Sequence, residues 1–205
     1  MKIDRSLGKT FGTVSLLYDK ARIGYPPDLI NDIILFSQIK KEGKILEVGC
    51  GSGQATISFA EKGYSITGLD ISNDLLDIAK RKCSVFPQVR FMVNSFEDAV
   101  IKENSVNLII SGLAWHWVKP ERRYEKAYRI LRDDGTLAFF WSYQQKGKSE
   151  IVGAVGKIFD KYGSKGAGPA GSRMKEYAEF VYNELQNHQL FEDVQKKEYS
   201  IDIDF

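Results

Sequence analysis

The sequence predicts an α/β fold, in which a doubly wound, mostly parallel sheet carries helices on both faces. Two observations predict it. Short apolar runs alternate with segments of helical spacing along the middle of the chain, and a glycine-rich turn joins the first apolar run to the helix after it. A chain of 205 residues with 43% hydrophobic residues can bury one sizeable core, so a single domain over residues 1–205 is expected.

The predicted strands are continuous apolar runs, which are typical of parallel strands buried on both faces. They cover residues 44–49, 65–71, 89–93, 106–112 and 136–142. Helices are predicted between them over residues 54–62, 73–83 and 120–131. Ser72 is expected to cap the helix that follows it, and Asp133-Asp134-Gly135 to form a turn before the last strand.

The two flanks differ from this central part, residues 41–143. Residues 1–40 are predicted to form a helical cap, because apolar side chains recur at helical spacing and Pro26-Pro27 marks the start of a second helix. Residues 144–175 are rich in Gly, Lys and Ser and are predicted to be a flexible lid or insertion. Residues 176–205 are expected to form a helix and a strand. Since an open sheet of this kind normally has one more strand, either the C-terminus is truncated or the last strand comes from elsewhere.

The composition narrows the class of partner. With 29 basic and 27 acidic residues, the net charge of +2 provides no basic footprint for nucleic acid. No signal peptide and no apolar run of about 20 residues is present, so no membrane association is expected. Cys50 and Cys83 lack metal-ligand spacing and are predicted to be buried thiols of a cytoplasmic protein without a metal. These features do not predict the oligomeric state.

The most informative segment is Glu47-Val48-Gly49-Cys50-Gly51-Ser52-Gly53, which leaves a predicted strand and enters a predicted helix. Glycines in such a turn allow a tight bend and let a ligand approach the backbone. The N–H groups at the start of the helix favour a carboxylate or a phosphate equally. The turn by itself therefore predicts a ligand site without naming the ligand.

The spacing of residues around this turn narrows the choice of ligand. A dinucleotide fingerprint reads G-x-G-x-x-G, but Gln54 stands where its third glycine would be. Asp70 ends the next predicted strand, where an acidic side chain accepts hydrogen bonds from ribose hydroxyls. Together, the glycine turn, Asp70 and the strand–helix alternation indicate an adenosyl ligand.

These motifs resemble those of the class I S-adenosylmethionine-dependent methyltransferases, whose fold is Rossmann-like. ILEVGCGSG is similar to the family's glycine motif, GLDIS to its acidic ribose motif and RILRDDGTLAFF to the turn before its fifth strand. YDKARIGYPPDL and GLAWHW resemble a subgroup that methylates small molecules, including small carboxylic acids. The resemblance covers most of residues 11–143.

The resemblance implies roles for particular residues. The glycines of the turn would pack against the methionine part of the cofactor, Glu47 would orient its ammonium group, Asp70 would hold the ribose and Ile71 would cover the adenine. Where the family commonly has an Asp after the third strand, this chain has Asn94, whose amide can both donate and accept. The full set of implied cofactor contacts is Tyr18, Arg22, Glu47, Gly49, Cys50, Gly51, Gly53, Asp70, Ile71, Asn94, Ser95, Phe96, Ser111 and Gly112.

The residues predicted on the acceptor side of the site each have an alternative role. His116 is the candidate general base, because imidazole titrates near neutral pH; its alternative is a packing role in the loop. The candidate lining of the acceptor pocket is Tyr25, Trp115 and Trp117. The alternative is that at least one of the two tryptophans packs in the core. Arg22 would pair with the methionine carboxylate, and its alternative is an ordinary solvated charge.

Other charged side chains are assigned to the surface. These are His188, Lys196, Lys197, Arg122, Arg123 and Lys126.

The expected activity is transfer of a methyl group from S-adenosylmethionine to a small-molecule acceptor, with a carboxylate as one candidate, leaving S-adenosylhomocysteine. A nicotinamide-dependent oxidoreductase on the same sheet is one alternative, although it should show the x-x-G continuation that Gln54 interrupts. A nucleic-acid methyltransferase is disfavoured, because the segment after the fourth strand reads Ser111-Gly112-Leu113-Ala114 rather than Asn/Asp-Pro-Pro-aromatic. A cofactor-binding protein without turnover is the third alternative.

Overall fold

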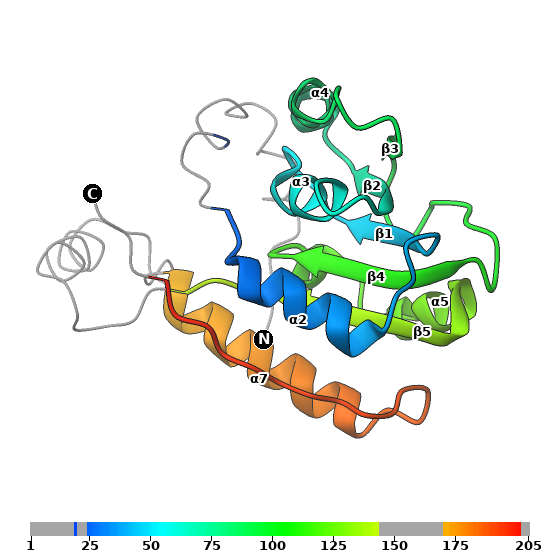
Figure 1. Cartoon of the computed structure of the whole chain (residues 1–205). Coiled ribbons are helices and arrows are strands. Elements are labelled where there is room, and N and C mark those ends of the chain that lie inside the picture. The colour runs from blue at the N-terminus through cyan, green and yellow to red at the C-terminus, as the bar shows by residue number, and fades with distance from the viewer. Residues whose placement is uncertain (1–18, 20–23, 144–169, 202–205) are drawn as a thin grey trace, which may run out of the picture. The chain divides into compact units, whose positions relative to one another are not determined.

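The computed structural model describes residue 19 and residues 24–143 and 170–201 (Figure 1). Contacts between Cα atoms divide the described residues into two compact units: residues 140–143 and 170–196, and residues 19, 24–139 and 197–201. The second unit holds most of the sheet and the glycine turn. The single domain expected from the chain length stays a prediction.

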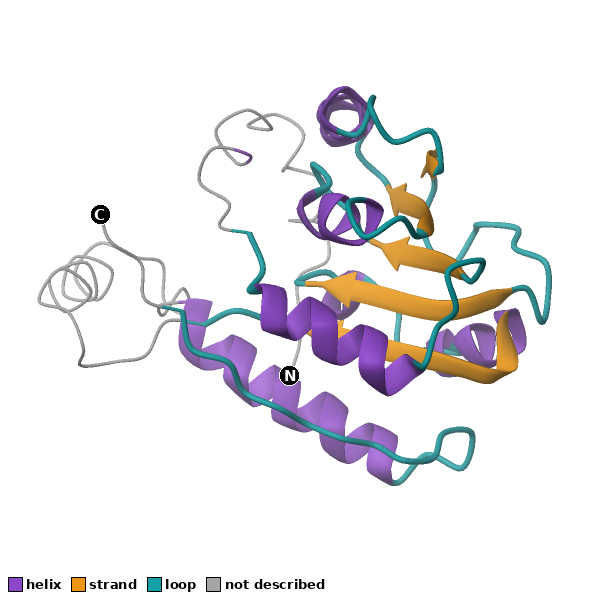
Figure 2. Ribbon diagram, in the orientation of Figure 1, coloured by secondary structure: helices purple, strands orange, loops and turns teal. Residues whose placement is uncertain are grey.

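The sheet contains β1 (Lys44–Val48), β2 (Ser65–Asp70), β3 (Val89–Val93), β4 (Val106–Gly112) and β5 (Leu131–Phe140). Their order is β3-β2-β1-β4-β5, drawn as orange arrows in Figure 2. The pairs β1–β2, β2–β3 and β1–β4 are parallel. Because the chain turns back between β1 and β4, the carboxyl ends of these strands form the switch point where ligands bind in open α/β sheets.

The helices of this unit are α2 (Pro27–Ser37), α3 (Gln54–Ala60), α4 (Asn73–Lys82) and α5 (Arg123–Ile130), with a short 3₁₀ helix η2 (Trp115–Trp117) after β4. Right-handed crossovers place α3 and α4, which lead from β1 outward to β3, on one face of the sheet. The crossover from β4 to β5 runs in the opposite direction, so α5 lies on the other face (Figure 1). The predicted doubly wound sheet is confirmed.

Several boundaries follow from local chemistry as predicted. Ser72 caps α4 and accepts a hydrogen bond from the Leu75 N–H at 3.3 Å. The last turn of α4 carries three basic residues, which complement the negative end of its dipole. Pro27 is the first residue of α2, where its missing N–H leaves no helical bond unmade.

The predicted boundaries around β5 are wrong. The helix expected from residue 120 begins at Arg123, because Arg122 has a left-handed φ of 59° that no helix can include. β5 then starts at Leu131, so the Asp133-Asp134-Gly135 turn lies inside the strand instead of before it. The backbone bends tightly there, since a Cβ on Gly135 would lie 2.8 Å from the Arg132 carbonyl oxygen. The strand ends at Phe140, two residues earlier than expected.

The flanks match the predictions only in part. Helix α7 spans Ala170–Gln186, so residues 170–175, expected in a flexible lid, are helical. Residues 198–201 were expected to begin a strand, and none is assigned to them. They follow Lys197, whose Nζ bonds Asp32 of α2 at 3.0 Å, beside the Tyr199 hydroxyl, which donates to the same oxygen at 2.6 Å.

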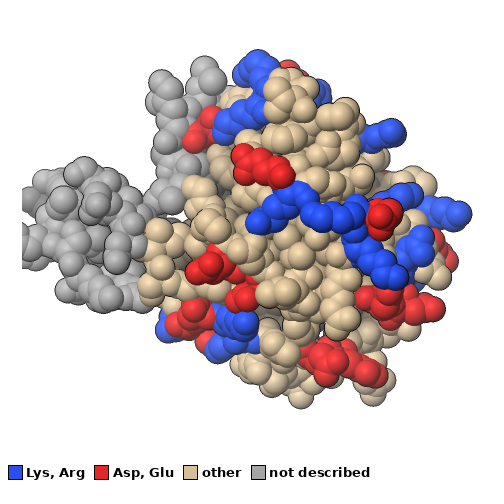
Figure 3. Space-filling view, viewed as in Figure 1, with Lys and Arg blue, Asp and Glu red and all other residues tan. Residues whose placement is uncertain are grey.

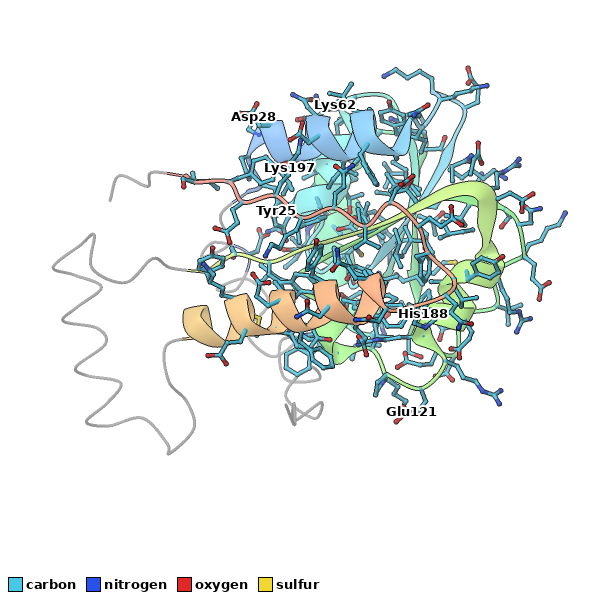
Figure 4. The ribbon with its side chains drawn as sticks, turned by 90° about the horizontal axis from the view of Figure 1, so that it is seen from below. Tyr25, Asp28, Lys62, Glu121, His188 and Lys197 are labelled. Atoms are coloured by element: carbon cyan, nitrogen blue, oxygen red, sulfur yellow. The ribbon has the colours of Figure 1, made fainter. Side chains whose placement is uncertain are left out.

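Figure 4 shows Lys197 beside α2, and His188 beyond the end of α7, half-buried against the ring of Phe191 rather than on the polar helix surface predicted for it. The remaining parts of the cap and lid, residues 1–18, 20–23 and 144–169, lie outside the described residues.

The core is centred on β1 and β4. Leu108, Ile109 and Ile110 are fully buried, and four of the five positions of β1 are buried. Figure 3 shows Lys and Arg interspersed with Asp and Glu on the face in view, as the net charge of +2 suggests. Among the described helices none has the length and apolarity needed to cross a membrane.

Candidate cofactor and acceptor site

The turn after β1 is built on three glycines with left-handed backbone. Gly49, Gly51 and Gly53 have φ values of 71°, 54° and 87°, a region that other residues rarely adopt. A Cβ on Gly49 would lie 2.3 Å from Cβ of Ala114, in the loop after β4. The N–H groups of Gly49 and Cys50 both donate to the Leu69 carbonyl oxygen, at 2.8 and 2.9 Å, and fix the turn against β2. The turn therefore presents bare backbone at the switch point.

Asp70, at the end of β2, connects the glycine turn to β2 through hydrogen bonds of its carboxylate. One carboxylate oxygen accepts from the Gly51 N–H at 2.9 Å, and the other accepts from the Ser72 N–H at 2.9 Å. A carboxylate has about four acceptor positions, so ribose hydroxyls can be added to these bonds. Burial raises the pKa of Asp70, while the backbone N–H groups act in the opposite direction. The two bonds orient the carboxylate before any ligand arrives.

Glu47 is a buried carboxyl group on β1. It is 2% exposed, and its Oε2 accepts a hydrogen bond from the Thr56 hydroxyl at 2.5 Å. Burial raises its pKa to about 8, with a further increase from the charge of Asp70. Glu47 is therefore mainly protonated at neutral pH, and a cation placed beside it would favour the carboxylate.

The residues expected at the adenine end divide into two groups. Ile71 is 47% exposed, and half-buried Asn94 donates its backbone N–H to the Asp70 carbonyl at 3.0 Å. Ser95, by contrast, uses its hydroxyl in a local turn with Asp98, at 2.7 Å, and Phe96 is 3% exposed. Ile71 and Asn94 thus keep accessible side-chain surface just after β2 and β3.

The side chains of Cys50 and Ser111, two of the predicted cofactor contacts, make contacts within the fold. The Cys50 thiol is buried and packs against Gly68, where a Cβ would lie 2.7 Å from its sulfur. Burial raises the pKa of this thiol, and that of Cys83 to about 11, and the predicted burial of both thiols is confirmed. The Ser111 hydroxyl donates to the Val48 carbonyl at 2.8 Å, which ties β4 to β1 beside Gly112.

The comparisons with known proteins agree with this geometry. Residues 46–139 match the model of the methyltransferase domain family. A probable S-adenosylmethionine-dependent methyltransferase of Saccharomyces cerevisiae is 33% identical over 150 residues, which cover 71% of this chain and 50% of the yeast protein. The chain belongs to the class I S-adenosylmethionine-dependent methyltransferases. An uncharacterized methyltransferase of Mycobacterium tuberculosis is 28% identical over 162 residues, or 79% of this chain and 62% of that protein.

The chain therefore spans between half and about three fifths of the length of these two curated relatives. Two solved structures share the fold. A Methanococcus maripaludis protein, provisionally assigned as an S-adenosyl-L-methionine-dependent methyltransferase, has a TM-score of 0.60 at 21% identity and covers 91% of this chain and 84% of its own. Phosphoethanolamine N-methyltransferase 2 of Haemonchus contortus, in complex with S-adenosylhomocysteine, has a TM-score of 0.58 at 18% identity, covering 76% and 40%.

S-adenosylmethionine is the cofactor of this family, and the described residues of the methyltransferase fit it. A glycine-rich turn, an oriented carboxylate on Asp70 and a buried acid on Glu47 are in place at the switch point. Tyr18 and Arg22, the remaining predicted contacts, lie outside the described residues. No group of three or more His, Cys, Asp or Glu side chains that could hold a metal ion occurs within the described part of the chain.

The methyltransferase places Trp115 in its core, not in a pocket. Trp115 is 0% exposed and stacks on Phe139, with ring centroids 4.2 Å apart and planes at 25°. Phe96 and Tyr124 complete this aromatic cluster, at 5.5 and 5.9 Å. The structure thus favours the alternative of core packing for Trp115, because η2 turns its ring beneath α5 and leaves no surface for an acceptor.

His116 and Trp117 follow directly in η2. His116 is 6% exposed, and its ring lies 4.6 Å from that of Trp117, which is half-buried like Tyr25. A side chain of this burial can act on an acceptor only through one edge of its ring. Trp117 and Tyr25 are the pocket candidates that keep accessible surface.

The assignment of Arg123 to a solvated face is wrong. Arg123 is 4% exposed, its Nη2 donates to the Tyr124 hydroxyl at 3.1 Å, and its guanidinium lies 4.8 Å from the centre of that ring. A signal was present in the sequence, since Arg123, Ala127 and Ile130 recur at helical spacing on the buried face of α5. Lys126 likewise bonds two carbonyls, those of Glu97 at 2.9 Å and Ala99 at 2.6 Å.

A cavity of about 550 Å³ lies beside α5, apart from the glycine turn. Charged side chains line most of it, among them Glu97, Arg123 and Lys126. Phe96 is the one predicted cofactor residue among the lining residues. The cavity therefore does not coincide with the proposed cofactor position.

Proposed function

We propose that this chain transfers a methyl group from S-adenosylmethionine to a small-molecule acceptor, leaving S-adenosylhomocysteine. The observation that carries the proposal is the Asp70 carboxylate, oriented by the Gly51 and Ser72 N–H groups beside a turn with three glycines of positive φ. Asp70 would hold the ribose, and the turn would hold the methionine part. The same geometry supports an adenosyl ligand over a nicotinamide dinucleotide, because Gln54 interrupts the dinucleotide fingerprint.

Within this proposal the remaining cofactor contacts have separate tasks. Glu47 would exchange its proton for an ion pair with the ammonium group, Ile71 would cover the adenine and Asn94 would read its edge. The cofactor supplies an activated methyl group, so the main task of the protein is to align the acceptor for in-line displacement and to exclude water. Trp117 and Tyr25 would contribute the wall on the acceptor side.

His116 is proposed as the general base for acceptors that must lose a proton. A carboxylate acceptor is already an anion and needs no base, whereas a hydroxyl or amine does. Replacing His116 by Ala should therefore lower turnover of neutral acceptors by about 10²- to 10⁴-fold and leave a carboxylate acceptor within a few-fold of wild type. Equal losses for both acceptor classes would assign His116 to packing.

A small-molecule acceptor is supported by the near balance of charge and by the Ser111–Ala114 segment after β4. The proposal includes a cytoplasmic location, where the free thiols of Cys50 and Cys83 would stay reduced.

The proposal is tested with labelled S-adenosylmethionine and purified protein. Binding is measured first, by calorimetric titration with S-adenosylhomocysteine and with NAD, on the wild type and on Gly51→Val. Transfer of label is then followed to a panel of small carboxylic acids, phenols and amines, with transfer RNA and duplex DNA in parallel. Binding of NAD in place of S-adenosylhomocysteine would overturn the cofactor assignment. Binding without any transfer would favour a protein that holds the cofactor without turnover, and transfer to nucleic acid alone would overturn the acceptor class.

A further inference from the structure

Lys126, on α5, is bonded to the segment of chain that follows β3. Its Nζ donates to the carbonyl oxygens of Glu97 at 2.9 Å and Ala99 at 2.6 Å, and it lies 5.4 Å from the centre of the Phe96 ring. These partners belong to residues 94–99, here called the post-β3 segment, all of them described and in neither a helix nor a strand. An ammonium has three N–H donors, and here two of them reach backbone carbonyls while the charge faces an aromatic ring. One side chain of α5 thus contacts the segment at three points.

The post-β3 segment depends on bonds to other elements for its position. Its internal bond, from the Ala99 N–H to the Ser95 carbonyl at 3.0 Å, closes a turn but does not determine where the turn lies. At the start of the segment, the Asn94 N–H donates to the Asp70 carbonyl at 3.0 Å and fixes this end against β2. At the other end, Lys126 binds the two carbonyls and fixes the segment against α5.

A cavity borders the junction between α5 and the post-β3 segment. It is the cavity of about 550 Å³ described above, and residues of both elements line it, among them Phe96, Glu97, Ala99, Lys126 and Arg129. Close packing fixes neighbouring elements in a protein core, but a cavity removes such contacts from one side of a junction. The hydrogen bonds of Lys126 are therefore the contacts that hold the two elements together beside this space.

Lys126 differs in its surroundings from Arg129, one turn further along the same helix. Arg129 pairs with the Glu103 carboxylate, and the two side chains are 67% and 61% exposed, whereas Lys126 is half-buried. Burial lowers the pKa of Lys126, while the carboxylates of Asp98 and Glu97 act in the opposite direction. Exposed ion pairs contribute little, but hydrogen bonds from a partly enclosed charge are among the stronger ones. Arg129 is thus a matched control for Lys126.

The post-β3 segment connects α5 to the candidate site. Its first residue is Asn94, proposed above to read the edge of the adenine and bonded through its backbone to Asp70. Two residues later, the Phe96 ring lies 5.5 Å from that of Trp115, which begins η2. A displacement of the segment would therefore move the Asn94 amide relative to a bound adenine.

We propose that Lys126 is a positioning residue of the cofactor site, which holds the post-β3 segment against α5 and so sets where Asn94 meets the adenine. The inference rests on the proposed function, because the adenine contact of Asn94 belongs to it. The donors of Lys126 are directed at backbone carbonyls, so its effect on the cofactor passes through the segment. The Asp70 carboxylate does not depend on Lys126, since the Gly51 and Ser72 N–H groups orient it.

The test is a double-mutant cycle between Lys126 and Asn94 in the full chain. The dissociation constant of S-adenosylhomocysteine is measured by calorimetry. Lys126→Met and Asn94→Ala should each weaken binding about tenfold, the effect of losing one good hydrogen bond. The double variant should also be weakened about tenfold rather than about 100-fold, because Lys126 acts through Asn94 and the two losses do not add. Arg129→Met breaks an exposed pair on the same helix and should bind like wild type.

Two conservative variants separate positioning from a loss of fold. Lys126→Arg keeps a charged group with N–H donors for both carbonyls, so it should bind within about threefold of wild type. Lys126→Gln keeps an amide donor without the charge and should lie between Lys126→Arg and Lys126→Met. It also replaces Lys126→Met in the cycle if that variant does not fold. The melting temperature without ligand, recorded for every variant, shows that each protein is folded at the temperature of the titration.

Asp70→Ala is measured alongside these variants to separate the possible failures. If Asp70→Ala loses binding while Lys126→Met binds like wild type, or while its loss adds in full to that of Asn94→Ala, the role of Lys126 is overturned and the proposed function stands. The same conclusion follows if Arg129→Met loses as much affinity as Lys126→Met, or if Asn94→Ala binds like wild type. If Asp70→Ala binds like wild type, the proposed cofactor site itself is overturned.

Discussion

The carboxyl ends of β1 and β2 and the carboxyl end of β4 are built in different ways. At β1 and β2, hydrogen bonds join two short sequence motifs, the glycine turn and the segment around Asp70. One example is the bond from the Gly51 N–H to the Asp70 carboxylate. After β4, the residues of η2 owe their positions to side chains from β5 and α5, such as Phe139 and Tyr124. The first region is specified by short sequence motifs, and the second by packing between distant side chains. Cofactor motifs can therefore be predicted from the sequence, whereas acceptor pockets cannot.

The largest effect is expected from a substitution that breaks the packing of the second region. Trp115→Ala would remove a fully buried ring from its stack on Phe139 and should lower the free energy of unfolding by about 4 kcal/mol. Trp117→Ala is the control, because half-buried Trp117 should cost about 1 kcal/mol. Urea titrations of both variants measure the difference, and equal costs would show that Trp115 is not a core residue.

The next largest effect is expected at the contact between Gly49 and Ala114, where the two regions meet. Gly49→Ala would suffer from both a left-handed φ and a Cβ contact of 2.3 Å, and should cost about 3 kcal/mol of unfolding free energy. Gly63→Ala has a φ of 84° with no atom within 4 Å of the new Cβ, so it isolates the backbone strain, at about 1 kcal/mol. Should the two variants unfold at the same urea concentration, the close approach of the two loops would be disproved.

The first region is probed by Asp70→Ala. Loss of a carboxylate that accepts ribose hydroxyls should weaken S-adenosylhomocysteine binding by about 100-fold, since hydrogen bonds to a charged group are among the strongest. Asp74→Ala, on the exposed face of α4, should leave the dissociation constant unchanged. Titration calorimetry at one ionic strength compares them, and similar constants for both variants would exclude Asp70 from the site.

Measured over one pH unit, the smallest expected effect is a pH dependence set by Glu47. Its pKa is about 8 in the folded protein against an ordinary 4.5, so between these values the folded state holds a proton that the unfolded state has lost. The free energy of unfolding should therefore fall as pH rises through this window, by at most about 1.4 kcal/mol per pH unit, and Glu47→Gln should lack this slope.

Cofactor affinity responds to Glu47 in the opposite direction. Affinity of the wild type should increase as pH approaches 8, because the carboxylate, not the acid, attracts the ammonium group. Urea titrations and calorimetry across pH 5–8.5 follow the two effects. A wild-type profile that coincides with that of Glu47→Gln would contradict a buried, proton-holding Glu47.

Local signals predicted much of the fold. Ser72 was identified as a cap because its hydroxyl needs only the N–H three residues later. Gly49, Gly51 and Gly53 predict a tight turn because glycine has no Cβ, and their positive φ values confirm the turn. The boundaries of β5 were missed, since a turn-like Asp133-Asp134-Gly135 was bent into the strand by its neighbours.

The contacts of Arg123 and Trp115 could not be predicted in the same way. Each meets partners that are distant in the sequence or brought close by η2 and α5, and residue type by itself does not reveal burial.

By itself, the sequence determined the doubly wound sheet, the glycine turn, the acid at the end of β2 and thereby the methyltransferase family. These features depend on backbone conformation and on strand and helix periodicity, which neighbouring residues set. Only the tertiary structure decided that Trp115 and Arg123 are buried and that the burial of Glu47 raises its pKa. Burial and charge pairing depend on which distant side chains meet, and that is fixed when the sheet and helices pack together.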